Sequence, residues 1–251
     1  MRLGVVIPSM DNLPMLNTCL VNLAAAVTGA DELEECKIIV VDNASVVPYD
    51  ERQLTIPNVE ILRLDQRCSF SRACNLAAAR LGDCDYLFFL NNDVFLHPES
   101  IDAMLNSLRD TKSQISGTRL VYLDGKIQHS GVEFDQNSIP YHINHFVESN
   151  SYPRFIRRWL AVTGAALFVE SRVFDQLSGF DERFPFGYED IDFCLRAGLS
   201  GFFVTCAQRV DSVHLSGRTH NERTQRLLSE SREIFLKRWK NQVPISSEGR
   251  N

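Results

Sequence analysis

The stretch FLNNDVFLHP, residues 89–98, places polar residues between two apolar segments, and the reason for this break decides the fold. It contains the end of an apolar run, 86–90, that is typical of a buried β-strand. Three adjacent polar side chains, Asn91, Asn92 and Asp93, follow at once, and a second short apolar run comes directly after them. Polar groups between two buried segments need partners or a function, because burying them alone costs free energy.

Composition narrows the class of protein. The chain has 251 residues, of which 44% are hydrophobic and 23% are charged, and these values are ordinary for a soluble globular protein. The formal net charge of −6 argues against a general nucleic-acid-binding protein, which needs a basic surface. No apolar run approaches the roughly 18 residues that span a bilayer.

The first residues and the cysteines predict the compartment. The chain enters a strand-like run within residues 1–6, without the layout of a signal peptide. The seven cysteines are scattered and form no C-x-x-C pair, which favours reduced thiols over a disulfide framework or a zinc site. We therefore expect a cytoplasmic protein.

The first third of the sequence alternates strand and helix patterns. Short apolar runs predict four strands, at 3–8, 37–41, 59–64 and 86–90. Helical spacing of apolar residues, an alanine-rich segment and a proline at a first-turn position predict three helices, over 13–27, 70–81 and 98–108. Continuous apolar strands separated by helices are typical of a parallel sheet covered on both faces, so the predicted fold class is α/β.

The second half of the chain changes character. Residues 113–150 are rich in turn residues and predict strands and loops wrapped around the sheet. A strand is expected at 163–171, a helix at 189–198 and a charged amphipathic helix at 223–240. Four residues of the helix at 189–198 are expected to face the core: Ile191, Cys194, Leu195 and Gly198. No repeat or linker divides the sequence, so we expect one domain over 1–251.

Polar clusters follow three of the predicted strands. They are residues 9–11, residues 42–43 and residues 91–93. In open parallel sheets, ligands bind beyond the carboxyl ends of the strands, so these clusters should meet in one crevice. The break at Asn91, Asn92 and Asp93 is then the floor of a binding site.

Five segments carry a resemblance that covers most of the chain. They are VVIPSMDN (5–12), IIVVDNAS (38–45), FLNNDVFLHP (89–98), LVYLDGKIQHSGVEFD (120–135) and VTGAALFVESRVFDQLSGFDERFPFGYEDIDFCLRAG (162–198). In this order they resemble glycosyltransferase family 2, the inverting nucleotide-sugar transferases of the GT-A fold. The fourth segment is similar to one in the bacterial branch of surface-polysaccharide and rhamnosyltransferase-like enzymes.

The resemblance implies a fold and an activity. The fold is a Rossmann-like, mostly parallel sheet covered by helices, with an acceptor-side region of strands and loops. The activity is metal-dependent, inverting transfer of a sugar from a nucleoside-diphosphate donor, with UDP or dTDP favoured, to a hydroxyl group of a glycan or lipid-linked glycan. Within the domain it implies a nucleotide-binding half at 1–112, an acceptor-side half at 113–220 and a C-terminal helix and tail at 221–251.

Two residues are candidate metal ligands. Asp93 stands in the place of the family's D-x-D motif, although Asn91 replaces the first aspartate, and His214 matches a late histidine of the family. A divalent cation that bridges the diphosphate stabilises the charge on the leaving group, and an oxygen-rich site suits Mg²⁺ or Mn²⁺. The alternatives are a turn or capping aspartate and a hydrogen-bonded histidine at a strand end.

The donor nucleotide-sugar is expected to contact eight residues: Pro8, Ser9, Asp11, Asp42, Arg72, Asn75, Asn91 and Asn92. Asp42 resembles the residue that accepts a hydrogen bond from the nucleobase, and its alternative is a turn that it holds by bonding to the backbone. Asp11 holds the base or ribose, or caps the following helix. Arg72 and Asn75 face the diphosphate or the sugar, with a solvated helix face as the alternative for Arg72. The family's turn glycine is missing from 65–70, which weakens the expected contacts there.

The acceptor side contains the expected catalytic residue. Asp190 resembles the family's general base, and Gly164, Glu189 and Asp192 are expected on the acceptor side. The alternative is that the three acids only favour a helix N-terminus through its dipole.

Other histidines and basic segments have two interpretations each. His142 and His145 are either metal ligands or loop residues near the acceptor, and the lack of helical pattern favours the second. The segments 153–160 and 232–240 mix basic and aromatic residues. They either attach the protein peripherally to the inner face of an anionic membrane or pack as ordinary structure, and 153–160 could also contact the acceptor.

We keep two rival functions. A non-catalytic nucleotide- or glycan-binding module would retain the same fold. A sugar-nucleotide pyrophosphorylase would need a glycine-rich, basic phosphate loop near the N-terminus, and IPSMDNLP (7–14) has no such pattern.

Overall fold

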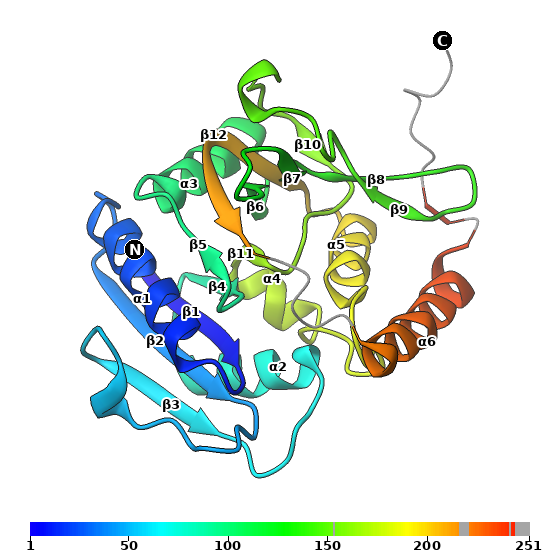
Figure 1. Cartoon of the computed structure of the whole chain (residues 1–251). Coiled ribbons are helices and arrows are strands. Elements are labelled where there is room, and N and C mark those ends of the chain that lie inside the picture. The colour runs from blue at the N-terminus through cyan, green and yellow to red at the C-terminus, as the bar shows by residue number, and fades with distance from the viewer. Residues whose placement is uncertain (153, 216–220, 241, 244–251) are drawn as a thin grey trace.

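The computed structural model describes residues 1–152, 154–215, 221–240 and 242–243 (Figure 1). The elements of the first half are β1 (Arg2–Ser9), α1 (Leu13–Thr28), β2 (Glu35–Asp42), η1 (Glu51–Gln53), β3 (Val59–Arg63), α2 (Phe70–Leu81), β4 (Tyr86–Leu90), β5 (Val94–Phe95) and α3 (Ser100–Thr111). Those of the second half are β6 (Ile115–Val121), β7 (Ile127–His129), β8 (Val132–Phe134), β9 (Pro140–His142), η2 (Ser149–Ser151), β10 (Arg158–Trp159), β11 (Ala166–Glu170), α4 (Ser171–Gln176), α5 (Glu189–Leu199), β12 (Val204–His214) and α6 (Glu222–Trp239).

A large mixed sheet forms the centre of the molecule. Its strands follow the order β10-β12-β6-β11-β4-β1-β2-β3, with β5 added to β12 and β7 added to β6. β1 pairs in parallel with both β2 and β4, and β2 with β3. The predicted α/β class with a mostly parallel sheet is confirmed.

One central strand runs against its neighbours. β11 is antiparallel to both β4 and β6, which the sequence pattern does not reveal. Because Ala166 pairs with Leu90, the residues that precede β11 lie beside the residues that follow β4. Thr163 and Gly164 are thereby placed at the same edge of the sheet as Asn91, whose N–H donates to the Ala165 carbonyl at 2.9 Å.

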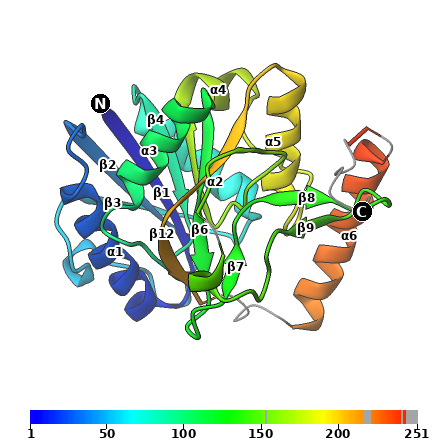
Figure 2. The same ribbon diagram turned by 90° about the horizontal axis from the view of Figure 1, so that it is seen from above.

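Helices cover both faces of the sheet (Figure 2). On one face, α1 and α3 pack against alternate residues of β1 such as Val5 and Ile7. On the other face, α2, α4 and α5 enclose Val6 and Phe89. Successive residues of a strand point to opposite faces, so the continuous apolar runs predicted this two-sided covering.

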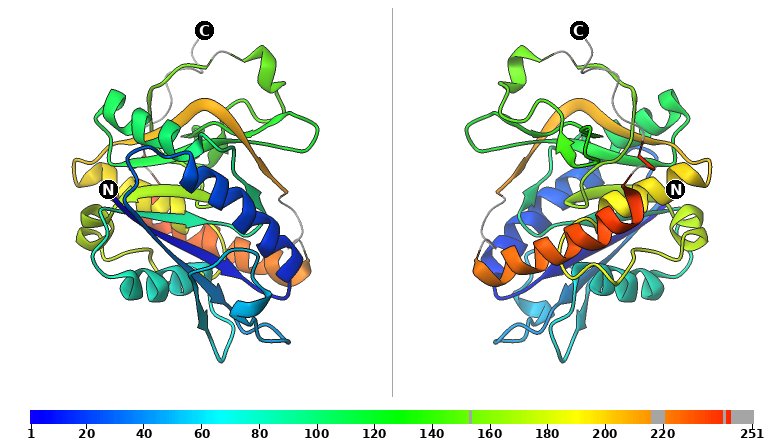
Figure 3. Two further views of the ribbon diagram at one scale, coloured as in Figure 1. Left: turned by 90° about the vertical axis from the view of Figure 1, so that its left-hand side faces the viewer. Right: turned by 90° about the vertical axis from the view of Figure 1, so that its right-hand side faces the viewer.

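The last helix forms a third, smaller apolar cluster. α6 lies beside α5 and next to the β8–β9 hairpin (Figures 2 and 3). Phe235 and Trp239 are buried there against Phe134, Phe184 and Leu195. The basic and aromatic segment 232–240 is therefore packing structure over its described residues, as its plainer interpretation predicted.

Several finer expectations differ from the structure. Cys194 and Leu195 are buried as predicted and Ile191 is half-buried, but Gly198 is exposed because α5 ends one residue later. The turn-rich middle folds into short strands, where Gly131 has a φ of +129° and lies under the Trp159 ring. In the part of the chain that the structure describes, no helix is long and apolar enough to cross a membrane.

Candidate active site

Polar residues from several strand ends meet in one crevice. As expected, the crevice is lined by residues that follow β1, β2 and β4, including Asp11, Asn43 and Asp93. Its other walls are the loop at 67–70, the pair Pro185 and Phe186, and the first turn of α6. Pro8, Ser9, Asn91 and Asn92 also line it. Segments far apart in the sequence thus build one concave site at the edge that parallel strands leave open.

Asp93 lines this crevice, and His214 faces its carboxylate. His214 is the last residue of β12 and pairs with Val94 of β5, directly after Asp93. The His214 Nε2 atom lies 3.2 Å from the Asp93 Oδ1 atom, and the two side chains are 11% and 20% exposed. The strand pairing therefore brings together two donors that are 121 positions apart in the sequence.

Gln128 of β7 fixes the orientation of the His214 ring. The Gln128 Nε2 atom donates to the His214 carbonyl at 3.3 Å, so its Oε1 atom is the one that faces the ring. His214 Nδ1 lies 2.5 Å from that oxygen, which can only accept a hydrogen bond. In a neutral imidazole, the Nε2 atom toward Asp93 then carries the lone pair.

This pair fits a divalent cation. Two cis ligands of an octahedral ion at about 2.1 Å stand about 3 Å apart, close to the observed separation of the donor atoms. A hydrogen bond donated by the remote ring nitrogen, here from His214 Nδ1 to Gln128 Oε1, is the usual support of a ligating histidine. Among the described residues, no group of three or more His, Cys, Asp or Glu side chains could hold a metal. The described residues would therefore supply two ligands to a cation, whose other positions phosphate and water can fill.

The loop after β1 is bonded to its neighbours. Asn92 Nδ2 donates to Ser9 Oγ at 2.8 Å, and that oxygen lies 3.0 Å from the Tyr49 hydroxyl. Asp11 has a φ of +53°, and its carboxylate accepts from the Val46 N–H at 2.7 Å. Capping of α1 falls to Asn12, whose Oδ1 accepts from the Met15 N–H, so the alternative of Asp11 as the cap is wrong. Asp11 lies between the crevice and a second hollow beside Tyr49.

Asp42 does not reach the crevice. Its side chain is fully buried, and it accepts hydrogen bonds from the Ser45 and Tyr49 N–H groups and from Arg63 at 2.7 Å. Despite burial, these hydrogen bonds hold the pKa of Asp42 below its usual range. The predicted contact with a nucleobase is not supported by this geometry, which corresponds to the alternative, a turn held by a carboxylate.

Arg72 and Asn75 are not among the residues that line the crevice. Arg72 is exposed and pairs with Glu182 at 3.2 Å. The Asn75 amide donates to the Phe180 carbonyl and accepts from the Phe180 N–H, which ties α2 to the loop before α5. Both were predicted to contact the donor, and these contacts do not support that prediction.

Two arginines, which the sequence motifs did not indicate, also line the crevice. Arg67 lies in the loop before α2, and Arg223 lies in the first turn of α6. Both are exposed, and among the described residues neither has an ion-pair partner. The only signal in the sequence is their position beside loops that converge on the site, since neither belongs to a matched motif.

Asp190 begins α5 and is held by the loop before β11. The Gly164 N–H donates to Asp190 Oδ2 at 2.6 Å, and a Cβ atom on Gly164 would lie 3.1 Å from the Asp190 Cβ. Asp190 Oδ1 accepts from the Ile191 N–H. Burial raises the pKa of Asp190, and the two backbone hydrogen bonds oppose the rise. Asp190 is half-buried and lines another pocket, which is separate from the crevice and from the hollow beside Tyr49.

Glu189 differs from its neighbour. It is 6% exposed, and its Oε2 atom has no hydrogen-bond partner among the described residues. Burial, together with the charge of Asp190, raises the pKa of Glu189 well above its usual range. Two adjacent carboxyl groups in different environments are suited to different roles. Asp190 is the more accessible member of the pair, whereas burial favours the protonated form of Glu189.

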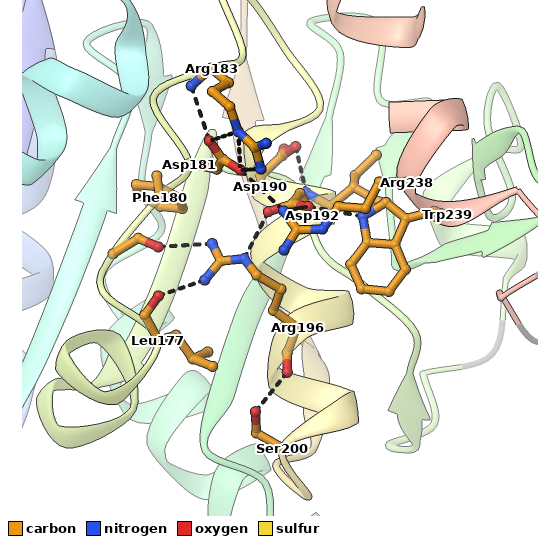
Figure 4. A network of polar contacts seen from close by, with 12 residues as sticks. Leu177, Phe180, Asp181, Arg183, Asp190, Asp192, Arg196, Ser200, Arg238 and Trp239 are labelled. Carbon is orange, nitrogen blue, oxygen red and sulfur yellow. Dashed lines mark hydrogen bonds and ion pairs between the residues drawn. The ribbon is translucent and has the colours of Figure 1, made fainter. Parts of the chain in front are cut away.

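Asp192 is a structural residue. Its carboxylate is fully buried and receives Arg196 at 2.8 Å, Arg238 at 3.0 Å and the Trp239 indole N–H at 2.8 Å (Figure 4). Arg238 also pairs with Asp181, so this network joins α6 to α5. The prediction that Asp192 faces the acceptor is wrong, because no atom of the side chain is accessible.

The other histidines and the basic segment lie in loops and short strands. His142 is in β9, and its Nδ1 atom lies 2.8 Å from His129 Nδ1, whereas His145 bonds to the Tyr122 hydroxyl. Neither joins a metal cluster among the described residues. In the segment 153–160, whose first residue lies outside the described residues, Arg157 stacks on Trp159 and Arg158 on Phe203. Those two cations therefore contact the protein's own aromatic rings.

Sequence comparison assigns the chain to known relatives. The profile of the family described as glycosyl transferase family 2 matches residues 4–159. The O-antigen biosynthesis protein RfbC of Myxococcus xanthus is 26% identical over 223 residues, which are 85% of this chain and 17% of that protein. The N-acetylglucosaminyl-diphospho-decaprenol L-rhamnosyltransferase of Mycobacterium tuberculosis is 25% identical over 183 residues, which are 63% and 59% of the two chains. The chain thus spans less than two thirds of either relative.

Solved structures share the fold. GalNAc-T7 with UDP, GalNAc and Mn²⁺ superposes with a TM-score of 0.64 at 12% identity, over 94% of this chain and 47% of that one. TarS of S. aureus in complex with UDP-GlcNAc gives a TM-score of 0.59 at 14% identity, over 99% and 69%. At these identities the likeness concerns the fold alone.

Proposed function

The chain belongs to glycosyltransferase family 2, and we propose that it transfers a sugar from a nucleoside-diphosphate donor to a hydroxyl group of a glycan or lipid-linked glycan, with inversion. The observation that carries the proposal is the placement of two sites at one sheet edge. Asp93 lines the crevice after β4 and faces His214, and Asp190 is held by Gly164, which lies just before β11 and beside that same strand end. One site is suited to a leaving diphosphate and the other to an attacking hydroxyl.

The residues on the donor side would bind and stabilise the diphosphate. Asp93 and His214 would hold Mn²⁺ or Mg²⁺, which supplies Lewis-acid stabilisation to the phosphate oxygens when it is bound. Arg67 and Arg223 line the same crevice and offer positive charge from two different segments, the loop before α2 and the first turn of α6. Charge-assisted hydrogen bonds from arginine to phosphate are among the strong ones. Both residues would act on the same leaving group as the cation.

Asp190 would act as the general base. The acceptor oxygen forms a bond to the anomeric carbon as the bond from that carbon to the diphosphate breaks, and the proton of the hydroxyl passes to Asp190. The hydrogen bonds from Gly164 and Ile191 aim the carboxylate. Its partial burial favours proton uptake, because a buried carboxylate is less well solvated.

The relatives support the choice of substrates. One relative is named for L-rhamnose transfer to N-acetylglucosaminyl-diphospho-decaprenol, and another for O-antigen biosynthesis. We propose a UDP- or dTDP-sugar as donor and a lipid-linked saccharide as acceptor. Work on such an acceptor would take place at a membrane surface, with the protein bound peripherally.

Nucleotide binding and donor hydrolysis test the proposal. UDP, dTDP and GDP, each with Mn²⁺, should be screened by thermal shift, and one of the first two should raise the melting temperature most. A nucleotide at about 100 times its Kd adds roughly 2.7 kcal/mol of stability. The matching sugar nucleotides should then be hydrolysed slowly without acceptor. Binding without any hydrolysis or transfer would instead support a non-catalytic module, and no binding of any of the three would contradict the proposal.

A further inference from the structure

A pocket separate from the donor crevice adjoins Asp190. It is lined by the β8–β9 hairpin, the loop before β11, the start of α5 and one residue of α6. The residues that matter here are Tyr141, His142, Thr163, Tyr188, Asp190 and Ile191. None of the residues that line the donor crevice lies in it, so it offers separate space beside the proposed base.

The lining of this pocket suits a sugar ring. A pyranose has apolar C–H faces and a rim of hydroxyl groups, and it therefore needs both apolar walls and a few placed polar groups. Tyr141 and Tyr188 supply flat rings with polar tips, and Ile191 supplies apolar surface. His142, Thr163 and Asp190 supply the polar groups. Among the described residues, no lysine or arginine lines the pocket.

The proton positions on His142 follow from its neighbour. His129 is 1% exposed, and burial keeps the pKa of His129 well below its usual range, so this ring is neutral. The Thr163 N–H points at His129 Nε2 from 3.5 Å and can only donate, which places the His129 proton on Nδ1. That proton then points at His142 Nδ1, 2.8 Å away. In neutral His142 the proton must be on Nε2.

His142 is thus presented as a hydrogen-bond donor. His142 is an exposed residue, and its Nδ1 atom is held by the buried His129. Backbone pairing of Val132 with His142 fixes the strand that carries it. The same short strand, β7, supplies Gln128 to His214 and His129 to His142, so it supports one residue on each side of the reaction.

We propose that this pocket binds the acceptor as a sugar unit, and that His142 is a positioning residue that donates from Nε2 to a hydroxyl group of that sugar next to Asp190. The inference rests on the proposed transferase function. It adds the substrate class of the acceptor end, a pyranose held by its face and rim, and one residue that would select among its hydroxyl patterns. His142 itself takes no proton in the transfer.

Direct binding of simple glycosides tests the proposal. Methyl glycosides of glucose, galactose, N-acetylglucosamine and rhamnose should be titrated into protein that holds UDP and Mn²⁺, with saturation-transfer NMR as the readout. At least one should bind. His142→Ala should weaken that binding about five- to tenfold, as expected for one lost hydrogen bond, and His142→Gln, which keeps an N–H donor, should weaken it less. UDP affinity should stay the same in both variants.

His145→Ala is the matched control. His145 is an exposed histidine three positions away that bonds to Tyr122 and does not line the pocket, so this variant should bind glycosides as the wild type does. Failure of all four glycosides to bind the wild type, or equal binding by wild type and His142→Ala, would overturn the inference. Neither result would touch the proposed function, which nucleotide binding and donor hydrolysis test separately.

A measurement without any ligand checks the proton positions. Long-range ¹H–¹⁵N correlation spectra of histidine-labelled protein distinguish the two neutral tautomers of an imidazole. At pH 7 we expect the Nδ1–H form for His129 and the Nε2–H form for His142, with the His142 signals assigned by comparison with the His142→Gln variant. An Nδ1–H form of His142 would contradict the proposed donor.

Discussion

The Nε2 atom of His214 lies 3.2 Å from the Oδ1 atom of Asp93, and β5–β12 pairing holds both residues in place. Two donors at this separation can bind one cation together, and without a cation they can form an ion pair only when the histidine is protonated. The arrangement thus explains the polar break after β4. The three residues Asn91, Asn92 and Asp93 connect β4 to β5, and they line the crevice at this strand end.

The first prediction concerns this pair. Asp93→Ala should abolish transfer and remove the part of nucleotide affinity that depends on Mn²⁺, because it removes the carboxylate ligand. His214→Ala should have a smaller effect, since phosphate and water can fill one vacant position. Calorimetric titration of UDP with and without Mn²⁺ is the measurement. Full Mn²⁺-dependent affinity in Asp93→Ala would show that Asp93 is not a ligand.

The second prediction separates a structural role from a binding role at Asp42. Asp42→Ala leaves two N–H groups and Arg63 without their buried partner, so it should lower the free energy of unfolding by about 2–4 kcal/mol. The preference among UDP, dTDP and GDP should remain as in the wild type. Urea unfolding and nucleotide titrations measure the two quantities. A variant of normal stability with altered base preference would return Asp42 to the donor site.

The third prediction concerns the network that joins α6 to α5. Asp192→Ala removes the carboxylate that Arg196 and Arg238 share. The free energy of unfolding should therefore fall by about 3 kcal/mol. Arg183→Ala is the control, because Arg183 is 69% exposed and its ion pair with Asp181 should contribute less than about 1 kcal/mol. Urea unfolding measures both losses. Equal losses of unfolding free energy in Asp192→Ala and Arg183→Ala would contradict the prediction that the buried carboxylate contributes more than the exposed ion pair.

The fourth prediction concerns Glu189. Its folded-state pKa is raised, so between the ordinary glutamate pKa and the raised value the unfolded chain gives up a proton that the folded protein keeps. Stability is therefore lost as the pH rises through this window. Glu189→Gln cannot ionise, so its melting temperature should exceed that of the wild type by an amount that grows from pH 5 to pH 8. A difference that does not change with pH would contradict the assigned burial of the carboxyl group.

Regular features of the sequence predicted most of the fold. The apolar runs and helical spacings of the first half predicted α2 and β4 at their observed bounds, because local periodicity is set by which face is buried. The reversed direction of β11 was not predictable, since a short buried strand has the same pattern whichever way it runs. Its direction depends on pairing with β4 and β6, which are distant in the sequence.

The site was predicted in part. Strand ends located Asp93 and Asn92 in the crevice, because position at a sheet edge is a property of topology. Asp42 and Asp192 have equally suitable positions, but their partners Arg63 and Arg238 come from other elements, so burial of the two carboxylates was not visible locally. Arg67 and Arg223 were missed for the same reason, as only the folded chain shows which cations line the crevice.

The central claim is that Asp190 takes the proton from the acceptor, and a pair of isosteric variants tests it most directly. Asp190→Asn keeps the size of the side chain but cannot accept the proton, whereas Glu189→Gln changes the adjacent, buried carboxyl group in the same way. The measurement is kcat for sugar transfer, with donor and Mn²⁺ affinities checked in parallel. We predict a loss of about 10²–10⁴-fold for Asp190→Asn with unchanged donor binding, and near wild-type turnover for Glu189→Gln. Near wild-type turnover in Asp190→Asn would contradict the account.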